Sequence, residues 1–366
     1  MTQSGRRIRY VVIGAGNIAQ VAVLPAFEHA AETSELVGIV SSDAQKRETL
    51  ARRYGLTHAG DYDQLEEVLD QAQADAVYVA VPNALHREMT ERAAKRGVHV
   101  LCEKPMAETV EDCQAMIEAC RAAKVKLMIA YRLHFEAANL SAIELARSGT
   151  LGELRAFSSV FSQRVHEGDV RTQRALAGGA AYDMGVYAIN AARYLFQDEP
   201  VEVLASCQTG FDGVDATSTA ILRFSEGRVA QLTASLDAAP VAYYRLIGTL
   251  GSLHVEPAYD YARDLTCHLT VNDKTTTQTF PRRDQFAPEL LHFSDCILND
   301  REPEPSGEEG LADVRIVRAM FRAAETGKAV VLTPFSRTSR PSPAQEMHAP
   351  AVEAPEPVNA PSPSGS

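Results

Sequence analysis

Residues 8–19 read Ile-Arg-Tyr-Val-Val-Ile-Gly-Ala-Gly-Asn-Ile-Ala, and this stretch decides the fold. Ile8 to Ile13 form a short run that is apolar except for Arg9 and Tyr10 and ends at a glycine, which is typical of a buried strand. Asn17 to His29 follow with helical periodicity. A strand, a glycine turn and a helix in immediate succession are the first half of a βαβ unit. The stretch therefore predicts the start of a parallel sheet covered by helices.

The turn itself has the pattern Gly14-x-Gly16-x-x-Ala19. Glycines at its first two positions permit a tight turn and let the backbone approach a pyrophosphate. The helix that begins at Asn17 and Ile18 offers its first N–H groups and a partial positive charge to an anion. We expect a dinucleotide to bind here; a simple glycine turn in an α/β protein is the alternative.

The first third of the chain continues the alternation of strands and helices. Strands are predicted at residues 8–13, 36–40, 76–81, 98–102 and 126–130, and helices at 17–29, 44–54, 63–69, 85–95 and 110–124. Strands separated by helices of this length form a doubly wound parallel sheet. Residues 1–130 are therefore predicted to be an α/β dinucleotide-binding domain.

The pattern changes after residue 130. Helices are predicted at residues 137–147, 182–196, 285–299 and 308–326, and strands at 201–208, 218–224, 229–235, 243–249, 252–255, 265–271, 275–280 and 329–332. A run of strands without intervening helices indicates a mostly antiparallel sheet. Residues 131–335 are therefore predicted to form a second domain, of the α+β class.

The last segment, residues 336–366, is rich in Pro, Ala, Ser and Glu. Its apolar content is too low to offset the entropy lost on ordering, so we expect a disordered tail. An interaction tail is the alternative.

The composition excludes several classes of protein. A chain of 366 residues with 45% hydrophobic composition exceeds what one core usually organises, so two domains are expected. A net charge of −12 disfavours binding to nucleic acid and to anionic membranes. The sequence has no apolar run long enough to span a bilayer and no apolar signal core, so we expect a cytoplasmic protein. Its six cysteines and ten histidines form no Cys-x-x-Cys or His-Glu-x-x-His motif, so we predict neither a disulfide framework nor a metal site.

The end of the second predicted strand discriminates between NAD and NADP. An NAD site commonly carries Asp or Glu there, which binds the ribose 2′-hydroxyl. Here the strand ends at Ser41 and Ser42, Asp43 comes late, and Lys46 and Arg47 follow. Small hydroxyls with nearby cations suit a 2′-phosphate, so we favour NADP, while Asp43 leaves NAD open.

The predicted strand at 76–81 is followed by Pro82 and by two polar residues, Asn83 and His86. Ligands of open α/β sheets bind at the carboxyl ends of parallel strands. We expect Asn83 to line the nicotinamide side of the crevice, with capping of the next helix as the alternative.

The strand at 98–102 is followed by Glu103-Lys104-Pro105. Proline stops the chain from continuing the ladder and fixes its exit angle. We expect the ammonium group of Lys104 to be held against the nucleotide. The alternative is an ordinary lysine in a surface turn.

A candidate proton-transfer site lies in the second domain. Asp183 and Tyr187 are four residues apart, so they share one helix face. Oxidation of an alcohol needs a group that takes the hydroxyl proton as hydride leaves, and a tyrosine does so only if its pKa falls from about 10 toward neutrality. A nearby ammonium favours that form, and we expect Lys104 to supply it. The alternatives are a core aromatic at Tyr187 and a helix-dipole charge at Asp183.

Over about residues 8 to 333 these motifs resemble the Gfo/Idh/MocA oxidoreductases, and within them the glucose–fructose oxidoreductase branch. The motifs that carry the resemblance are Gly14-x-Gly16-x-x-Ala19, Val81-Pro82-Asn83-x-x-His86, Glu103-Lys104-Pro105-Met106, Ala130-Tyr131-Arg132, Leu176-Ala177-Gly178-Gly179, Asp183-x-Gly185-x-Tyr187 and Ser306-Gly307-Glu308-Glu309-Gly310. Many relatives carry histidine at the position of Tyr187. With tyrosine there, the sequence resembles the aldose- and diol-oxidising members.

The resemblance implies a Rossmann domain followed by a domain with a large open antiparallel sheet, through which dimers or tetramers pack. It implies that Lys104 touches both cofactor and substrate, and that Asp183 and Tyr187 bind the reacting hydroxyl. Ser41 and Lys46 fall where this branch binds the 2′-phosphate. The predicted cofactor-binding residues are Gly14, Gly16, Asn17, Ile18, Ser41, Lys46, Tyr62 beside the adenine, Pro82, Asn83, His86, Glu103, Lys104 and Arg132.

The leading expectation is an NADP-dependent oxidoreductase that moves hydride between nicotinamide and a hydroxyl or carbonyl of a sugar. Alternatives are an NAD-dependent inositol or trans-dihydrodiol dehydrogenase, a redox-assisted glycoside hydrolase with bound NAD, and a non-catalytic dinucleotide sensor. A sensor has no need of the proton-transfer residues. One member of the branch traps its cofactor with an N-terminal arm. Because this sequence begins close to its first strand, we expect its cofactor to exchange freely.

Overall fold

The computed structural model describes residues 5–337 and 339–363, and the chain forms two compact units. Unit 1 comprises the chain up to Arg132, Arg283–Leu311 and the chain from His348 onward. Unit 2 comprises Leu133–Arg282 and Ala312–Met347. The sequence predicted one boundary near residue 130, whereas the chain returns to unit 1 twice after leaving it.

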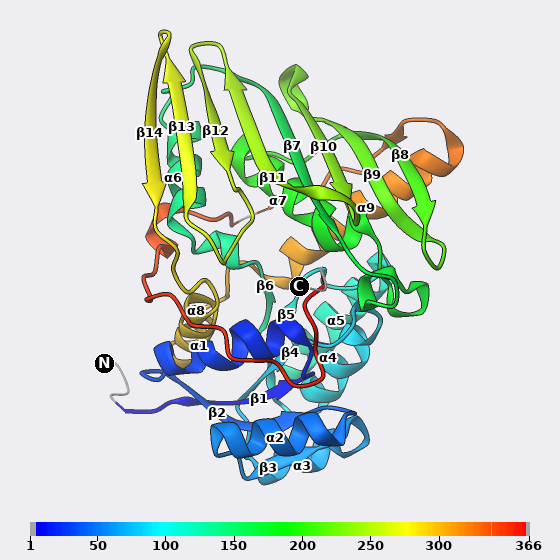
Figure 1. The fold of residues 1–366 in the computed structure, drawn as a ribbon, viewed down its shortest axis with the longest axis vertical. Coiled ribbons are helices and arrows are strands. Elements are labelled where there is room, and N and C mark those ends of the chain that lie inside the picture. The colour runs from blue at the N-terminus through cyan, green and yellow to red at the C-terminus, as the bar shows by residue number, and fades with distance from the viewer. Residues whose placement is uncertain (1–4, 338, 364–366) are drawn as a thin grey trace. The chain divides into compact units, whose positions relative to one another are not determined.

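The sheet of unit 1 is parallel throughout, with the strand order β3-β2-β1-β4-β5-β6 (Figure 1). Its strands are β1 (Ile8–Ile13), β2 (Ser34–Val40), β3 (His58–Gly60), β4 (Ala76–Val79), β5 (His99–Glu103) and β6 (Leu127–Ala130). The strand order reverses between β1 and β4, and such reversals are where doubly wound sheets bind ligands. The predicted Rossmann sheet is therefore confirmed.

Local signals explain where the helices of unit 1 begin and end. These helices are α1 (Leu24–His29), α2 (Ala44–Tyr54), α3 (Leu65–Gln71), α4 (His86–Lys95) and α5 (Val110–Ala123). The Asp43 side chain caps the start of α2, and Gly55 in the left-handed region ends it. The Thr109 hydroxyl caps α5 in the same way, by accepting from the N–H of Asp112.

A late helix, α8 (Ala287–Leu298), belongs to unit 1, although the sequence placed it in the second domain. It packs against α1, β1 and β2. The Ser294 hydroxyl lies 2.9 Å from the Tyr10 hydroxyl and 2.8 Å from that of Ser34. Helical periodicity shows that one face is apolar but does not tell which sheet that face covers.

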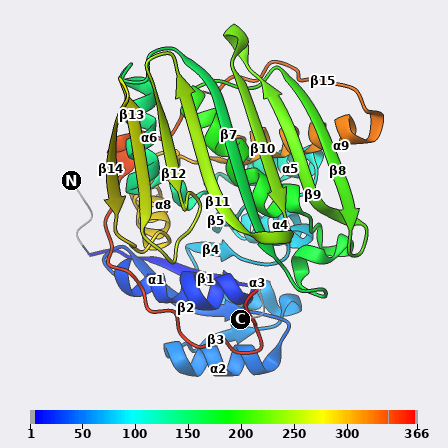
Figure 2. The ribbon, with the colours of Figure 1, turned by 45° about the horizontal axis from the view of Figure 1, so that its top comes forward.

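Unit 2 is built on a nine-stranded sheet with the order β14-β13-β12-β11-β7-β10-β9-β8-β15 (Figure 2). The strands are β7 (Leu154–Arg164), β8 (Glu202–Gly210), β9 (Val214–Arg223), β10 (Val229–Ser235), β11 (Asp237–Gly248), β12 (Gly251–Glu256), β13 (Leu265–Val271), β14 (Lys274–Phe280) and β15 (Val330–Val331). All neighbours are antiparallel except β7 and β10, which confirms the large, mostly antiparallel sheet.

Helices α6 (Ala137–Arg147) and α7 (Val186–Phe196) pack on one face of this sheet, and α9 (Gly307–Thr326) runs from unit 1 into unit 2. The sheet face beneath α7 is apolar and buried; Leu232 and Leu246 are fully inaccessible. The opposite face exposes Ile221, Val229 and Ile247. Among the described residues, no helix has both the length and the apolar character needed to cross a membrane.

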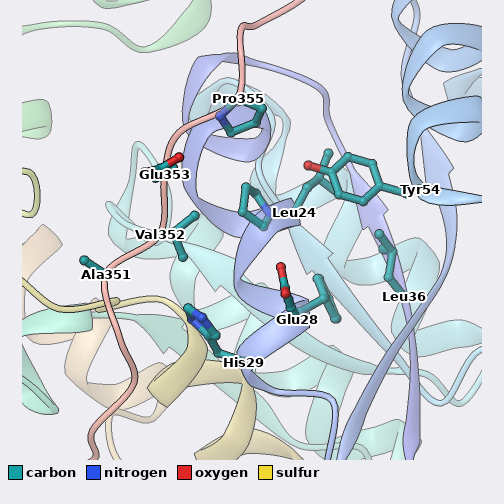
Figure 3. A pocket seen from close by; sticks show the side chains of 11 residues that line it. Leu24, Glu28, His29, Leu36, Tyr54, Ala351, Val352, Glu353 and Pro355 are labelled. Atoms are coloured by element: carbon teal, nitrogen blue, oxygen red, sulfur yellow. The ribbon is translucent and has the colours of Figure 1, made fainter.

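The C-terminal segment differs from the disordered tail that we expected. Residues 351–361, here called the strap, run extended along unit 1, where Val352 and Pro355 line a cavity with Leu24 and Tyr54 (Figure 3). Prolines restrict the unfolded chain, so that ordering this segment costs less entropy than its polar composition suggests.

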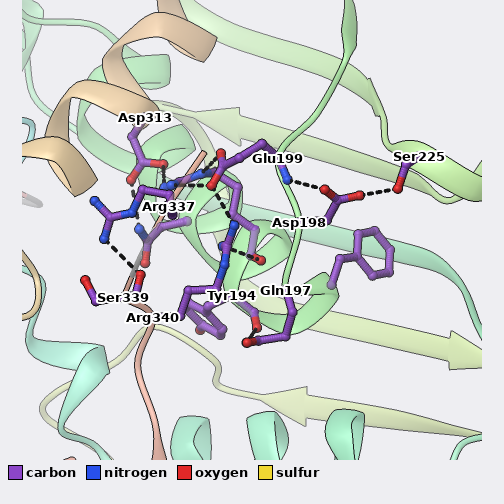
Figure 4. Close-up of polar contacts among 12 residues, drawn as sticks. Tyr194, Gln197, Asp198, Glu199, Ser225, Asp313, Arg337, Ser339 and Arg340 are labelled. Atoms are coloured by element: carbon purple, nitrogen blue, oxygen red, sulfur yellow. Dashed lines mark hydrogen bonds and ion pairs between the residues drawn. The ribbon is translucent and has the colours of Figure 1, made fainter. Parts of the chain in front are cut away.

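The segment before the strap is tied to a buried ion cluster of unit 2 (Figure 4). The side chains of Arg193 and Asp313 are both fully inaccessible and lie 2.5 Å apart. Glu199 pairs with Arg193 at 2.7 Å and with Arg340 at 2.9 Å. A buried guanidinium needs such partners, since an unpaired buried charge is costly.

Candidate functional site

The glycine turn of unit 1 has the geometry that close approach of a ligand requires. Gly14 has φ +102°, and a Cβ there would lie 2.2 Å from the Ala80 carbonyl oxygen, so no other residue fits. A Cβ at Gly16, in contrast, would meet nothing within 4 Å. The turn is thus packed against the end of β4 on one side and open over Gly16.

The helical segment after this turn supplies hydrogen-bond donors. The Gly16 carbonyl accepts from the N–H of Gln20, so Gly16 caps the helix. Within the part of the chain that the structure describes, the first-turn N–H groups of Asn17 and Ile18 have no partner. A π-helical turn, Ala19–Val23, leads into α1. Open space over Gly16 and unused N–H groups fit the pyrophosphate of a dinucleotide.

The end of β2 presents a hydroxyl and two cations. Ser41 is buried, and its carbonyl accepts from Arg47 at 2.5 Å. The Asp43 carboxylate accepts from the backbone N–H of Lys46 at 3.0 Å, and this bond holds the pKa of Asp43 below its usual range. Asp43 thus serves as the cap of α2, which uses its Oδ1. The side chains here fit a 2′-phosphate better than a free 2′-hydroxyl.

Tyr62 begins a short 3-10 turn, Tyr62–Gln64, which is fixed by a capping box between Asp61 and Gln64. Its carbonyl accepts from Arg92 at 2.8 Å. Burial, together with the charge of Asp61, raises the pKa of Tyr62. The phenol therefore stays protonated and uncharged. An uncharged ring suits the predicted position beside an adenine.

His86 is fully buried under the loop that follows β5. Its Nδ1 lies 2.9 Å from the Pro105 carbonyl oxygen, and its Nε2 lies 3.0 Å from that of Val81. Desolvation lowers the pKa of His86. The ring therefore joins the ends of β4 and β5. It acts as a brace for both strand ends, and its contact with a cofactor stays a prediction.

The turn next to His86 is the 3-10 segment Asn83–Leu85, whose N-cap is Pro82. Asn83 is half-buried and its side chain does not cap this turn. Both the cofactor contact and the capping role considered for Asn83 stay predictions.

A buried polar chain lies beneath Lys104. The Tyr78 hydroxyl donates to Glu103 Oε1 at 2.8 Å and lies 3.4 Å from Glu289 Oε2. Glu103 Oε2 accepts from the backbone N–H of Lys104 at 3.2 Å. Burial raises the pKa of Glu103, and burial together with the charge of Glu103 raises that of Glu289 well above its usual range. Burial thus favours the protonated form of both carboxyl groups, and more strongly for Glu289 than for Glu103.

Arg132 lies in the same buried region, where its guanidinium contacts Gln285. Its charge lowers the pKa of both Glu103 and Glu289, against the effect of burial. Arg132 is thus a counter-charge to the two carboxyl groups.

In unit 2, Asp183 lies in a π-helical turn, Ala181–Gly185, directly before α7. Arg171 donates from Nε to Asp183 Oδ2 at 2.9 Å and from NH1 to Asp169 Oδ1 at 3.1 Å. The sequence predicted one continuous helix from residue 182. The structure inserts a wider turn, a feature that is frequent at functional sites.

The start of this turn is fixed by Asp215, which is buried. Asp215 Oδ2 accepts from the N–H of Ala181 at 2.7 Å and from the Ser218 hydroxyl at 2.6 Å. A Cβ at Gly179 would lie 2.1 Å from Asp215 Oδ1, and Gly179 has φ +127°. Glycine at 179 is therefore required twice, by the contact and by the backbone.

Tyr187 is the second residue of α7, and its ring is partly exposed. It packs edge to face against Phe161, with ring centroids 5.6 Å apart, and lies 5.8 Å from the ring of Tyr259. Aromatic contacts on two sides fix the direction of the phenol.

The predicted site residues thus form two groups. The group in unit 2 consists of Asp183 and Tyr187. The group in unit 1 consists of Gly14, Gly16, Asn17, Ile18, Ser41, Lys46, Tyr62, Pro82, Asn83, His86, Glu103, Lys104 and Arg132. Most of the group in unit 1 lie at or just beyond the carboxyl ends of parallel strands. The pairing of Lys104 with Tyr187 stays a prediction.

Sequence reasoning missed Tyr78, Glu289, Arg171 and Asp215. Two of them carried a signal, because Tyr78 is the one polar side chain of β4 and Glu289 interrupts an apolar helix. Arg171 and Asp215 lie in segments without periodicity and gave no such signal.

Comparison with known families extends these observations. The model of the oxidoreductase family with NAD-binding Rossmann fold, Gfo/Idh/MocA, matches residues 8–131. The model of the Gfo/Idh/MocA C-terminal domain matches residues 140–254.

Individual relatives cover nearly the whole chain. A D-xylose 1-dehydrogenase (NADP(+)) from Haloferax volcanii is 33% identical and covers 88% of this chain and 98% of its own. The structure of aldose-aldose oxidoreductase from Caulobacter crescentus, complexed with glycerol, is 38% identical, has a TM-score of 0.85, and covers 89% of this chain and 100% of its own. A 3-ketoreductase from Actinomadura kijaniata, in complex with NADP and TDP-benzene, is 28% identical with a TM-score of 0.79, over 87% and 98% of the two chains.

Proposed function

Because this chain belongs to the Gfo/Idh/MocA oxidoreductase family, we propose that it is an NADP-dependent enzyme that interconverts a hydroxyl and a carbonyl group of a sugar. Relatives named as xylose dehydrogenase, aldose-aldose oxidoreductase and sugar 3-ketoreductase support a sugar as the substrate. The nicotinamide supplies the hydride acceptor or donor when the cofactor is bound.

The observation that carries this proposal is the anchoring of Lys104. Its backbone N–H donates to Glu103, whose carboxylate is held in turn by Tyr78. A cation fixed beyond the carboxyl end of β5 stands at the sheet edge where a dinucleotide binds.

Each proposed catalytic residue has a separate role. Tyr187 takes the hydroxyl proton during oxidation and returns it during reduction. Lys104 stabilises the phenolate form of Tyr187, which is the form that accepts the proton in oxidation and the form left after the proton is given up in reduction. Asp183 accepts a hydrogen bond from a sugar hydroxyl and orients the reacting carbon, and Arg171 holds that carboxylate in place.

The choice of NADP over NAD is supported by the end of β2. Asp43 is engaged by α2, while Ser41 and Lys46 are suited to bind the 2′-phosphate. Tyr62 is proposed to flank the adenine. Asn17 and Ile18 are proposed to bind the pyrophosphate through their N–H groups.

The setting of the enzyme is also part of the proposal. The six cysteines are all free, which suits the reducing cytoplasm. The exposed apolar residues Ile221, Val229 and Ile247 on the sheet of unit 2 support a homodimer or homotetramer that packs through that sheet.

A panel of aldoses, inositols, anhydro-sugars and diols tests the proposal. Each compound is incubated with the enzyme and NADP or NAD, and reduced nicotinamide is followed by its absorbance. We expect turnover of at least one aldose, faster with NADP. Tight NADP binding without turnover of any compound would refute the proposal, and aglycone release without net cofactor reduction would favour the glycoside-hydrolase alternative.

A further inference from the structure

The strap ends at the dinucleotide-binding turn of its own unit. The Asn17 side chain donates to the Ala360 carbonyl oxygen at 2.9 Å. Gln20, which is fully buried, donates to the Val358 carbonyl oxygen at 2.9 Å and accepts from the Val358 N–H at 2.7 Å. The side chain of Gln20 therefore pairs with the strap as a neighbouring β-strand would.

The strap also reaches the end of β2. The Asn359 side chain donates to Gln45 Oε1 at 2.9 Å and lies 3.5 Å from Asp43 Oδ2. Three residues before Asn359, the Glu356 carbonyl oxygen accepts from the Arg53 side chain at 3.1 Å. Contacts to the glycine turn and to the start of α2 bracket the place where the adenosine half of a dinucleotide binds.

Apolar contacts hold the preceding part of the strap. Val352 and Pro355 line a cavity together with Leu24 and Pro25 of α1 and Tyr54 of α2 (Figure 3). Ala360, at the other end, is only 7% exposed. The strap is thus docked at both ends and not merely near the surface.

The strap leaves the pyrophosphate donors unused. It bonds to the side chains of Asn17 and Gln20, whereas in the described part of the chain the N–H groups of Asn17 and Ile18 have no partner. An occupant that replaced the cofactor would use these donors, since they are the strongest anion-binding groups of the turn. The contacts therefore suit a cover over bound cofactor and not a competitor for its place.

We propose that the strap, residues 351–361, closes over the adenosine half of the bound dinucleotide and slows its release. This inference rests on the proposed function, because it assumes that NADP binds at the glycine turn. It replaces the expectation of free cofactor exchange. Two residues hold the strap in this position. Asn359 holds it over the end of β2, and Gln20 anchors it beside the glycine turn.

The test is the rate of cofactor release from the full chain and from a chain that ends at Pro350. This truncation keeps the backbone bond from the Asp284 N–H to the Ala349 carbonyl oxygen and removes the strap together with residues 362–366. Each protein is loaded with NADPH and mixed with excess NADP, and the loss of bound-NADPH fluorescence is recorded by stopped flow. We expect release to be at least tenfold faster from the truncated chain.

Point variants make the test specific. Asn359→Ala is expected to speed release several-fold, whereas Ala354→Ser, at an exposed strap position that makes no contact with the turn, is the matched control and is expected to leave it unchanged. Equal release rates from the full and truncated chains would overturn the inference. Slower release or tighter equilibrium binding after truncation would overturn it too, because the strap would then be a competitor.

Titration calorimetry with NADP separates this inference from the proposed function. If both chains bind NADP and oxidise the same sugar with equal release rates, the strap has no such role and the function stands. If the full chain binds no dinucleotide, both fail.

Discussion

Arg171 Nε donates to Asp183 Oδ2 at 2.9 Å, and the same guanidinium donates to Asp169. The guanidinium is planar, so these two bonds fix the direction of the Asp183 carboxylate as well as balance its charge. Arg171 comes from a loop that lies twelve residues before Asp183. The proposed sugar-binding carboxylate is therefore oriented by a residue outside the helix that carries it.

Replacing Arg171 by Leu is expected to lower kcat/KM for the sugar by about tenfold to a hundredfold. A hydrogen bond to a charged group contributes about 1.5–3 kcal/mol, and its loss frees the carboxylate to turn. Steady-state kinetics at saturating NADP measure the effect, and Arg171→Lys should restore part of it. Arg174→Leu, an exposed arginine of the same segment, is the control. Equal loss in both variants would contradict the orienting role.

Tyr187→Phe is expected to lower kcat at least a hundredfold, because general acid–base catalysis contributes about 10²–10⁴-fold. The phenylalanine ring keeps the contacts with Phe161 and Tyr259, so the free energy of unfolding should change little. Kinetics and urea unfolding are measured on the same preparations.

Tyr259→Phe serves as the matched control for that variant. The Tyr259 hydroxyl lies 2.7 Å from the Ser159 hydroxyl in the core, so its loss should reduce stability by about 1 kcal/mol and leave kcat near wild type. Wild-type turnover by Tyr187→Phe would show that another group takes the proton.

The sequence could predict those parts of the fold that local patterns determine. Apolar runs with glycine and proline boundaries located β1, β4 and β5 and the turn at Gly14, because buried parallel strands are apolar throughout. Strand β7 was not predicted. Phe157, Ser159 and Phe161 lie on one side of this strand, and Ser158 and Val160 on the other. A serine on the buried side and a valine on the other side mask the period of two.

Long-range partnerships were beyond the reach of local patterns. The periodicity of α8 indicated a helix but not that it would cover β1 and β2. The composition of the strap predicted disorder. Its order depends on hydrogen bonds to Gln20 and Asn17, which lie near the other end of the chain and cannot be inferred from the local sequence. Of the candidate site, the motif residues could be found, whereas supporting groups such as Arg171 and Asp215 could not, because their partners Asp183 and Ala181 lie 12 and 34 residues away in the sequence.

Lys46→Met is expected to weaken NADP binding by about tenfold and to leave NAD binding unchanged. An ammonium near the 2′-phosphate contributes Coulomb attraction that a ribose hydroxyl does not feel. Titration calorimetry with each cofactor gives the two dissociation constants. Lys95→Met, at an exposed position in α4, controls for the loss of one positive charge. Equal weakening of NADP and NAD would place the 2′-phosphate elsewhere.

Asp313→Asn is expected to reduce the free energy of unfolding by about 3–5 kcal/mol. The substitution leaves Arg193 fully buried with only one of its two carboxylate partners, Glu199. Glu202→Gln, which breaks the exposed pair with Arg223, should cost less than about 1 kcal/mol. Urea unfolding followed by circular dichroism measures both. Similar small losses would mean that the buried cluster is worth no more than a surface pair.

Glu289→Gln is expected to stabilise the protein increasingly as pH rises. The folded-state pKa of Glu289 is raised by burial and by Glu103, so the folded protein binds this proton more tightly than the unfolded chain. The stability that the neutral carboxyl contributes is complete below its unfolded pKa, near 4.5, and is lost as pH rises through the folded value. Glutamine stays neutral at every pH and keeps a carbonyl oxygen that can accept from the Tyr78 hydroxyl.

Thermal unfolding of the wild type and Glu289→Gln between pH 5 and 9 measures this effect. Once the wild-type carboxyl is ionised in the unfolded state and neutral in the folded state, the difference in unfolding free energy should grow by up to about 1.4 kcal/mol per pH unit. Glu118→Gln, on the exposed face of α5, should follow the wild type at every pH. A constant difference between wild type and Glu289→Gln would mean that Glu289 keeps its charge in the folded protein, and that Arg132 outweighs burial.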